Sequence, residues 1–381
     1  MRVIGWLLLS LLLAACSMQQ GALTGADKAP EFRKSSWQAL PEWRHVQLSS
    51  SLDALRQGCV SLANRDEWQQ VCAEAALLDA ENSDGLHRFF ESHFTPYQLR
   101  NGDGSAEGLI TGYYEPLLYG SREKSERFRY PVFGVPDDLM IVDLSNLYPQ
   151  LKGMRLRGRI EGRRIVPYYD RADIDAGHAP ADKVLLWVDD DISLFFLQVQ
   201  GSGRVELPDG SIVKLGYADQ NGHPYASIGK TLIDMGEMTL EQVTLQSIRQ
   251  WGLDHPDRLA TLLNSNPSYV FFREMPDALQ SAVGAMGVPL TAGYSMAVDK
   301  RVIGLGMPVF LATTWPGTEE PLHRLMLAQD TGGAIKGTIR GDFFWGFGEE
   351  AGKQAGKMKQ KGRMWVLFPG GLKPQTLAIK H

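Results

Sequence analysis

The residues best suited to chemistry lie near the C-terminal end of the sequence, where two aspartates twelve residues apart flank a glycine-rich segment. Asp330 follows an apolar run and precedes Thr-Gly-Gly, and Asp342 stands directly before Phe-Phe-Trp. An aspartate between an apolar run and two glycines is typical of a strand end on a tight turn. Functional side chains often project from such connections, so both carboxyl groups are candidates for a site.

The aromatic neighbours of Asp342 favour the role of a general acid. A carboxyl group packed against apolar rings loses solvation, and its pKa rises. A carboxyl group with a raised pKa can donate a proton near neutral pH. On the residues alone a second interpretation stays open, in which both aspartates only form turns.

Two other kinds of chemistry find little support. The sequence Asp330-Thr331-Gly332 is also the motif of aspartic proteases, but that chemistry needs two such carboxylates, and the chain holds no second copy. The eight histidines show no HExxH pattern, and no CxxC pattern occurs. We therefore expect neither a metal site nor a cofactor.

The composition is that of an ordinary globular protein of about two domains. The chain has 381 residues, of which 44% are hydrophobic and 22% charged, and its formal net charge is −5. At roughly 150 residues per domain, a single core is too small for this length. The negative charge gives no general attraction to nucleic acid, and we expect no nucleic-acid partner.

The N-terminus predicts export and a lipid anchor. A cationic start is followed by the apolar run Val3–Leu13, which is too short to span a bilayer, and then by Leu13-Ala14-Ala15-Cys16. This ending resembles a bacterial lipobox. The resemblance implies a signal peptide over 1–15, acylation of Cys16, and a polar tether over 16–36. Ser17 in place of aspartate implies an outer-membrane lipoprotein that faces the periplasm. The alternative is an ordinary signal peptide with a chance cysteine.

The two remaining cysteines leave two possibilities open. An oxidising compartment allows a disulfide between Cys59 and Cys72. The alternative is a pair of free thiols on neighbouring helices.

The expected elements alternate between helical and β-rich blocks. Apolar residues recur at helical spacing over 68–76 and 86–94, and 109–114 resembles a strand. The block 117–225 resembles strands, with hairpins at 161–162 and 208–211. We expect its further strands at 184–188 and 194–199, then helices over 225–264 with a capping box at 239–242, and short strands from 290 onward. This order suggests a β-rich domain inserted into a discontinuous one, while three domains in series stay open.

Six stretches of the sequence, in order along the chain, resemble the family of membrane-bound lytic murein transglycosylase A. They are Thr111–Pro116, Phe195–Gly203, Gly216–Tyr225, Asn266–Phe272, Ala297–Asp299 and Asp330–Gly337. The resemblance implies a mixed α+β fold, mainly β, with a double-psi β-barrel catalytic domain formed by 37–116 plus about 270–381. A smaller β-rich domain of about 117–270 would be inserted into it, and a substrate groove would run between the two.

The resemblance also assigns roles to individual residues. Asp299, Asp330 and Asp342 fall on the three signature aspartates of the family, with Asp342 as the general acid/base and the other two supporting it. The expected groove residues come from both domains and are Thr111, Tyr113, Tyr114, Glu115, Gln198, Gln200, Gly201, Ser202 and Gly203.

The implied activity is a lyase reaction on peptidoglycan glycan strands. The β-1,4 bond between N-acetylmuramic acid and N-acetylglucosamine would be cleaved without water, leaving a 1,6-anhydro-muramic acid end. One alternative is a hydrolytic muramidase that uses water with both Asp330 and Asp342. The other is a lipoprotein that binds murein without cutting it. The lipid partner would be the outer membrane, through Cys16, and the sequence names no protein partner.

Overall fold

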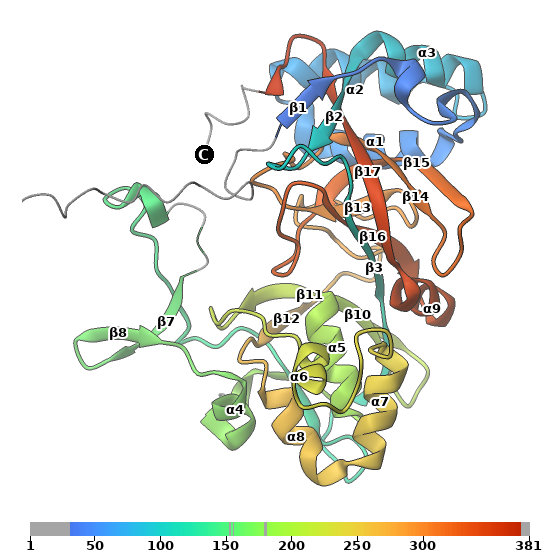
Figure 1. The fold of residues 1–381 in the computed structure, drawn as a ribbon. Helices are drawn as coiled ribbons and strands as arrows, with labels where there is room; N and C mark the ends of the chain where they lie inside the picture. Colours follow the sequence, from blue (N-terminus) through green and yellow to red (C-terminus); the bar gives the residue numbers. More distant parts are fainter. Residues whose placement is uncertain (1–30, 152–153, 155, 179–180, 375–381) are drawn as a thin grey trace, which may run out of the picture.

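The computed structural model describes residues 31–151, 154, 156–178 and 181–374. The expected signal peptide over 1–15, Cys16 and most of the tether lie outside the described residues. The described chain folds into two lobes of mixed α and β structure in which strands dominate, as the fold class predicted (Figure 1). Among these residues no helix is both long and apolar enough to cross a bilayer.

The first lobe is built on a closed ring of six strands. Around the ring the order is β17–β14–β15–β13–β16–β3, and β3 pairs again with β17. Strands β1 and β2 extend the sheet from β17. The strands are β1 (Glu31–Lys34), β2 (Phe94–Arg100), β3 (Gly108–Glu115), β13 (Ser295–Val298), β14 (Pro308–Thr314), β15 (Pro321–Asp330), β16 (Arg340–Phe347) and β17 (Lys359–Pro369). The ring is a barrel, and its double-psi arrangement stays a prediction.

Helices cover this barrel and complete its core. They are α1 (Ser49–Leu62), α2 (Asp66–Leu77), α3 (Ser83–His93) and α9 (Glu349–Lys357), of which α9 packs on β3 and β16. The two apolar stripes predicted at helical spacing are buried, apart from Ala76. They join the barrel side chains in the largest hydrophobic cluster. Burial of one face of each helix against the sheet explains why these segments are helical here.

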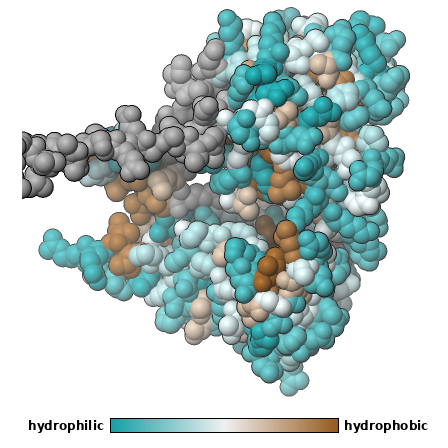
Figure 2. Space-filling model, viewed as in Figure 1, coloured by the Kyte–Doolittle hydropathy of each residue, from teal (hydrophilic) through white to brown (hydrophobic). Residues whose placement is uncertain are grey.

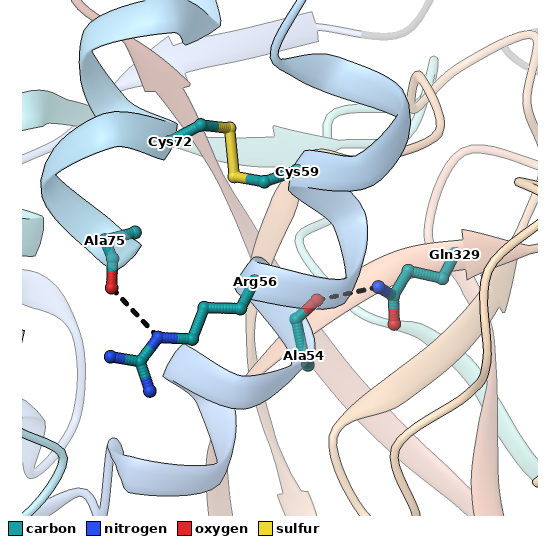
Figure 3. The surroundings of a disulfide bond; sticks show 6 residues. All are labelled: Ala54, Arg56, Cys59, Cys72, Ala75 and Gln329. Atoms are coloured by element: carbon teal, nitrogen blue, oxygen red, sulfur yellow. Dashed lines mark hydrogen bonds between the residues drawn. A yellow bond between two sulfur atoms is a disulfide. The ribbon is translucent and has the colours of Figure 1, made fainter. Parts of the chain in front are cut away.

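A disulfide between Cys59 and Cys72 joins α1 to α2 (Figure 3). Beside it, Arg56 Nε donates to the carbonyl oxygen of Ala75 at 2.9 Å. Gln329 Nε2 on β15 donates to the carbonyl oxygen of Ala54 at 2.8 Å. Helix α1 is therefore tied to α2 on one side and to the barrel on the other.

Replacing both cysteines of this disulfide with serine should lower the free energy of unfolding by about 3 kcal/mol. The bridge closes a short loop, with a sequence separation of 13, and so restricts the unfolded chain. Urea unfolding of the wild type, with and without reductant, measures the effect. The double variant is the control, since reductant should leave its midpoint unchanged. Equal midpoints for the oxidised and reduced wild type would contradict the expectation.

The second lobe carries a six-stranded sheet in the order β12–β11–β10–β4–β9–β5 and a separate three-stranded sheet, β6–β7–β8. Its strands are β4 (Leu117–Ser121), β5 (Tyr130–Phe133), β6 (Met140–Ile141), β7 (Arg157–Glu161), β8 (Arg164–Pro167), β9 (Val184–Val188), β10 (Ser202–Glu206), β11 (Ile212–Gln220) and β12 (Val270–Glu274). Its helices are α4 (Arg171–Asp173), α5 (Asp191–Gln200), α6 (Ile228–Asp234), α7 (Leu245–Asp254) and α8 (Pro256–Asn264). Both predicted hairpins and the strand at 184–188 are confirmed.

Two local predictions in this lobe are wrong. The expected strand at 194–199 is part of helix α5, because Asp190 caps the helix by accepting from the Ser193 N–H and Gly201 ends it with φ +79°. A short apolar run alone does not distinguish a strand from a buried helix. The expected capping box at 239–242 is also misplaced. Helix α7 begins at Leu245, with Thr244 and Ser247 forming the box.

The strands of the six-stranded sheet lie between residues 117 and 274, so this lobe interrupts the barrel chain between β3 and β13. Figure 1 shows β3 running from the barrel toward the second lobe. The exact limits of 37–116 plus about 270–381, and of about 117–270 for the insert, stay predictions.

Candidate functional site

Strand register places the two candidate aspartates in one row across the barrel wall. Ala297 on β13 is paired with Asp330 of β15 on one side and with Asp342 of β16 on the other. Asp342 is in turn paired with Thr111 of β3. Paired residues of neighbouring strands point to the same face of a sheet. The register shifts at Ala297 between β13 and β15, but Thr111 and Tyr113, two residues apart on β3, bond Asp342 and Asp330, so both carboxyl groups lie on one face.

Asp342 lies in an environment that holds its proton. Burial raises the pKa of Asp342 to about 6, although the hydrogen bond from Thr111 and the charge of Arg340 both act to lower it. The negative charge of Asp330 raises it further. Thr111 donates its hydroxyl proton to Asp342 Oδ1. The rise predicted from the aromatic neighbours is confirmed in direction, and a fraction of the carboxyl group is protonated near neutral pH.

Asp330 is held as an acceptor. Tyr113 Oη donates to Asp330 Oδ2 at 3.0 Å, while the backbone N–H groups of Ala285 and Thr331 donate to Oδ1, each at 2.9 Å. Burial and then the charges of Asp330 and Asp342 raise the pKa of Tyr113 well above its usual value, so its hydroxyl keeps the proton it donates. These hydrogen bonds fix the orientation of the Asp330 carboxylate.

Asp299, the third predicted aspartate, has a structural role. Its carboxylate is 2% exposed, receives two hydrogen bonds from the Arg301 side chain, and accepts at 3.0 Å from the N–H of Gly337. Burial acts to raise the pKa of Asp299, but the bonds from Arg301 and Gly337 outweigh it, so the pKa lies below the usual value. Asp299 therefore fastens the loop that connects β15 to β16, and the structure does not bring it into the row.

Glu115 forms an ion pair across the contact between the two lobes. Its side chain is 3% exposed and pairs at 3.0 Å with Arg204 of β10. The Arg204 guanidinium also lies 3.8 Å from the centre of the Phe347 ring and donates to the carbonyl oxygen of Gln280. Because its charge is already neutralised inside the protein, we assign Glu115 a structural role.

The predicted Gln-Gly-Ser-Gly turn lies at the same junction. Gln200 Oε1 accepts from the backbone N–H of Tyr114 at 3.0 Å, which links α5 to β3. A Cβ atom on Gly203 would lie 2.4 Å from Leu197 Cδ1, so any larger residue there would force the buried Leu197 side chain to shift. Ser202 in this turn and Tyr114 beside it are partly exposed, as is Thr111 farther along β3. Gln198, by contrast, is 5% exposed on α5, and we assign it a structural role as well.

Three arginines of the site were missed by the sequence analysis. Arg340 stands two residues before Asp342 on β16, a spacing that places both side chains on one face of the strand and could have flagged Arg340. Arg301 lies in the turn after β13, two residues after Asp299. Arg204 gave no local signal, because its partner Glu115 is 89 residues away in the sequence.

The arrangement offers one carboxyl group that can give up a proton, Asp342, and a second one, Asp330, that accepts hydrogen bonds on the same face. Such a pair suits general acid–base chemistry at an oxygen. In the described part of the chain, no group of three or more His, Cys, Asp or Glu side chains is placed to hold a metal ion.

Comparisons with known proteins point the same way. A family model described as the MltA specific insert domain matches residues 109–273, and one described as the 3D domain matches residues 294–368. The membrane-bound lytic murein transglycosylase A of Escherichia coli strain K12 is 34% identical over 278 residues, which cover 71% of this chain and 68% of that protein.

Solved structures are similar over most of the chain. The monoclinic form of MltA from Neisseria gonorrhoeae is 40% identical with a TM-score of 0.78, and the match covers 92% of this chain and 95% of that one. The structure of E. coli MltA with bound chitohexaose is 28% identical with a TM-score of 0.66, covering 84% of this chain and 90% of that one.

Proposed function

The chain belongs to the family of membrane-bound lytic murein transglycosylase A, and from this premise we propose that it is a peptidoglycan lytic transglycosylase. It cleaves the β-1,4 bond between N-acetylmuramic acid and N-acetylglucosamine and leaves a 1,6-anhydro end. The observation that carries the proposal is the row on the barrel wall, where Asp342, with a pKa of about 6, shares a face with Asp330. The chitohexaose bound to the E. coli relative supports a glycan ligand.

In the proposed mechanism one carboxyl group serves both steps. Protonated Asp342 donates its proton to the glycosidic oxygen as the N-acetylglucosamine unit leaves. The C6 hydroxyl of the muramic acid attacks its own anomeric carbon, and ionised Asp342 accepts the hydroxyl proton. The nucleophile belongs to the substrate, so the ring closure gains from effective molarity and needs no water.

Asp330 supports this reaction without forming a bond to the sugar. Its charge raises the pKa of Asp342, which keeps the acid protonated. Both oxygens of Asp330 already accept hydrogen bonds, from Tyr113 and from the N–H groups of Ala285 and Thr331, which leaves the carboxylate less available to activate water and disfavours the muramidase alternative. Hydrolytic glycosidases generally rely on a second, available carboxylate.

The glycan is proposed to lie between the lobes, at the junction of β3 with the turn after α5. The predicted groove residues that remain partly exposed there are Thr111, Tyr114, Gln200, Gly201 and Ser202. Tyr113 is 8% exposed and acts through Asp330.

Product analysis tests the proposed reaction. Purified sacculi are digested in water enriched in heavy oxygen, with a hydrolytic muramidase digest in parallel, and the muropeptides are identified by mass spectrometry. The proposal predicts unlabelled 1,6-anhydro-muramic acid ends. Labelled reducing ends would establish the muramidase instead, and binding without release of muropeptides would establish a murein-binding lipoprotein.

The pH profile should follow the proton on Asp342. The acid must be protonated to act, so kcat should fall as the pH rises through about 6. Because the Thr111 hydrogen bond lowers this pKa, Thr111→Val should move the falling limb to higher pH. Thr111→Ser keeps a hydroxyl and is the matched control. A falling limb at the same pH in both variants would contradict this assignment.

We also propose that acylated Cys16 anchors the chain to the outer membrane, with the enzyme facing the periplasm. Cys16→Ser should leave the protein uncleaved or move it to the soluble fraction. Fractionation of cell envelopes, with immunodetection, measures this shift. Membrane association equal to that of the wild type would refute lipidation at this residue.

A further inference from the structure

A small cavity of the first lobe contains an arginine side chain and several groups that can form hydrogen bonds. The cavity lies where the segment before α1 meets the hairpin between β14 and β15, and its volume is about 220 Å³. Its lining includes His45, Gln47, Tyr294, Trp315 and Arg324. On the face drawn in Figure 2, the described surface of this lobe is mainly hydrophilic. Recognition by polar groups therefore suits this lobe better than apolar docking.

Aromatic rings surround Arg324 on β15. Its guanidinium carbon lies 4.8 Å from the centre of the Tyr294 ring and 5.8 Å from the centres of the Trp315 and Phe343 rings. Cations at these distances are attracted to the faces of aromatic rings. The side chain is partly buried by these contacts. The rings therefore hold the guanidinium in a defined position at the wall of the cavity.

The charge of Arg324 is not neutralised by a carboxylate in the described part of the chain. Its side chain forms one hydrogen bond there, from Nη1 to the carbonyl oxygen of Gly293 at 3.3 Å, and no ion pair. Burial lowers the pKa of Arg324, and the charge that acts to raise it is that of Tyr294. A guanidinium carries five N–H donors, so most of them are available to a ligand. A partly buried cation without an internal partner favours an anionic ligand.

The size and charge of the cavity narrow the kind of anion. Sites for whole small molecules usually measure about 300–1,000 Å³, so this cavity suits the end of a longer ligand better than a complete sugar unit. Glu42 adds a negative charge at the rim, where it pairs with His323 at 3.0 Å, and this charge disfavours a dianionic phosphate. A carboxylate carries one charge and matches the planar fork of a guanidinium.

The remaining lining suits a peptide on the other side of that carboxylate. His45 and Gln47 can form hydrogen bonds with an amide group, and the rings of Tyr294 and Trp315 can contact a small apolar side chain. Peptidoglycan carries short peptides on its muramic acid units, and those that are not cross-linked end in a free carboxylate. The polymer would thus bring a ligand of this chemistry to the lobe that contains the proposed acid.

We propose that this cavity, which we call the Arg324 cavity, binds the free terminal carboxylate of a peptidoglycan peptide. The inference rests on the proposed function, which supplies the polymer. Arg324 pairs with the carboxylate and takes no part in proton transfer. Phe343, whose ring it approaches, directly follows Asp342 on β16, so the two side chains point to opposite faces of the strand. The cavity is therefore a second contact with the substrate, separate from the bond that is cut.

Isothermal titration calorimetry of the mature chain with short peptides tests the cavity directly. The probes are acetylated lysyl-D-alanyl-D-alanine, the same peptide with a C-terminal amide, and the all-L peptide with a free carboxylate. The free acid should bind at least about tenfold more tightly than the amide, because only the acid pairs with the guanidinium. Arg324→Met should lose a similar factor. Arg324→Lys should recover part of it, because lysine keeps the charge but not the fork.

The matched control is Arg363→Met. Arg363 is also a barrel arginine next to a tryptophan, 5.5 Å from the centre of the Trp365 ring, but it is exposed on β17 and does not line the cavity. This variant should bind the peptide as the wild type does. Equal affinities for the acid and the amide, or for the wild type and Arg324→Met, would overturn the proposal. Tighter binding of the all-L peptide would assign the cavity to a protein C-terminus instead.

Turnover experiments relate the cavity to the proposed activity. For the wild type, KM should be lower on peptide-bearing murein than on glycan strands from which an amidase has removed the peptides. Arg324→Met should remove this difference, and Arg324→Lys should restore part of it, which separates loss of the contact from loss of the fold. If neither substrate gives anhydro ends with the wild type, the proposed function fails, while the calorimetry still decides whether the cavity binds a peptide carboxylate.

Discussion

Asp342→Asn should lower the release of anhydro-muropeptides from sacculi by about 10²–10⁴-fold, the usual contribution of a general acid–base group. The variant keeps the shape of the side chain and an oxygen that can accept from Thr111. It removes the only proton donor proposed for the leaving oxygen. Turnover of purified sacculi, measured at pH 6, gives the size of the effect.

The same substitution should make the protein more stable at neutral pH. The pKa of Asp342 is about 6 in the folded chain, whereas the ordinary value of 3.8 applies to the unfolded chain. Folding therefore disfavours the ionised form of Asp342. The stability associated with the protonated group is fully present below pH 3.8 and is lost as the pH rises through about 6. In thermal melts, the Tm of the variant should therefore be higher than that of the wild type at pH 7–8. The difference in Tm should shrink as the pH falls toward 4.

Asp330→Asn and Asp143→Asn are the comparison variants. Asp143 is an exposed carboxyl group outside the site, and its replacement should leave turnover unchanged. Asp330→Asn should reduce turnover and also stability, because the three donors around that carboxylate lose a charged acceptor. Near-normal turnover by a well-folded Asp342→Asn variant, together with an inactive Asp330→Asn variant, would move the acid role to Asp330.

Arg204→Met should lower the free energy of unfolding by about 3–5 kcal/mol, since it leaves the Glu115 carboxylate buried without its partner. Arg122→Met is the matched control. Arg122 also pairs with a glutamate, Glu274, but the two side chains are 49% and 38% exposed. Solvated pairs of this kind contribute at most about 1 kcal/mol. Urea unfolding of both variants measures the difference.

A second variant separates the buried charge from the lost packing on Phe347. Arg204→Met combined with Glu115→Gln removes the unpaired charge and should recover part of the stability. If Arg204→Met and Arg122→Met lower the free energy of unfolding by the same amount, the junction between the lobes does not depend on the Glu115–Arg204 ion pair.

Local patterns in the sequence predicted much of the fold. The strand at 184–188, both hairpins and the buried helical stripes follow from alternation, turn residues and 3.6-residue spacing. The prediction of a strand at 194–199 was wrong because an apolar run of that length fits either a strand or a buried helix. The decisive signals were the N-cap at Asp190 and the helix end at Gly201.

The site was less accessible to local patterns. The raised pKa of Asp342 could be predicted from its aromatic neighbours, since they follow it directly in the sequence. Its partner Thr111 is 231 residues away, and Tyr113 is 217 residues from Asp330. Such contacts depend on which strands pair around the barrel, which no short window of sequence contains. The resemblance to a family named Thr111 and Tyr113 as groove residues but did not predict these hydrogen bonds.

The closed ring of strands has a consequence for how the protein is made. β17, the last strand described, pairs with β2, β3 and β14, so the barrel cannot close until the C-terminal part of the chain has been delivered. The six-stranded sheet of the second lobe has all its strands within residues 117–274 and needs nothing that follows them. As the chain emerges from its N-terminus, the second lobe therefore has its whole sheet available first, while β3 and Thr111 still lack their partners on β16 and β17. The site on the barrel wall is therefore complete only after β17 has been delivered.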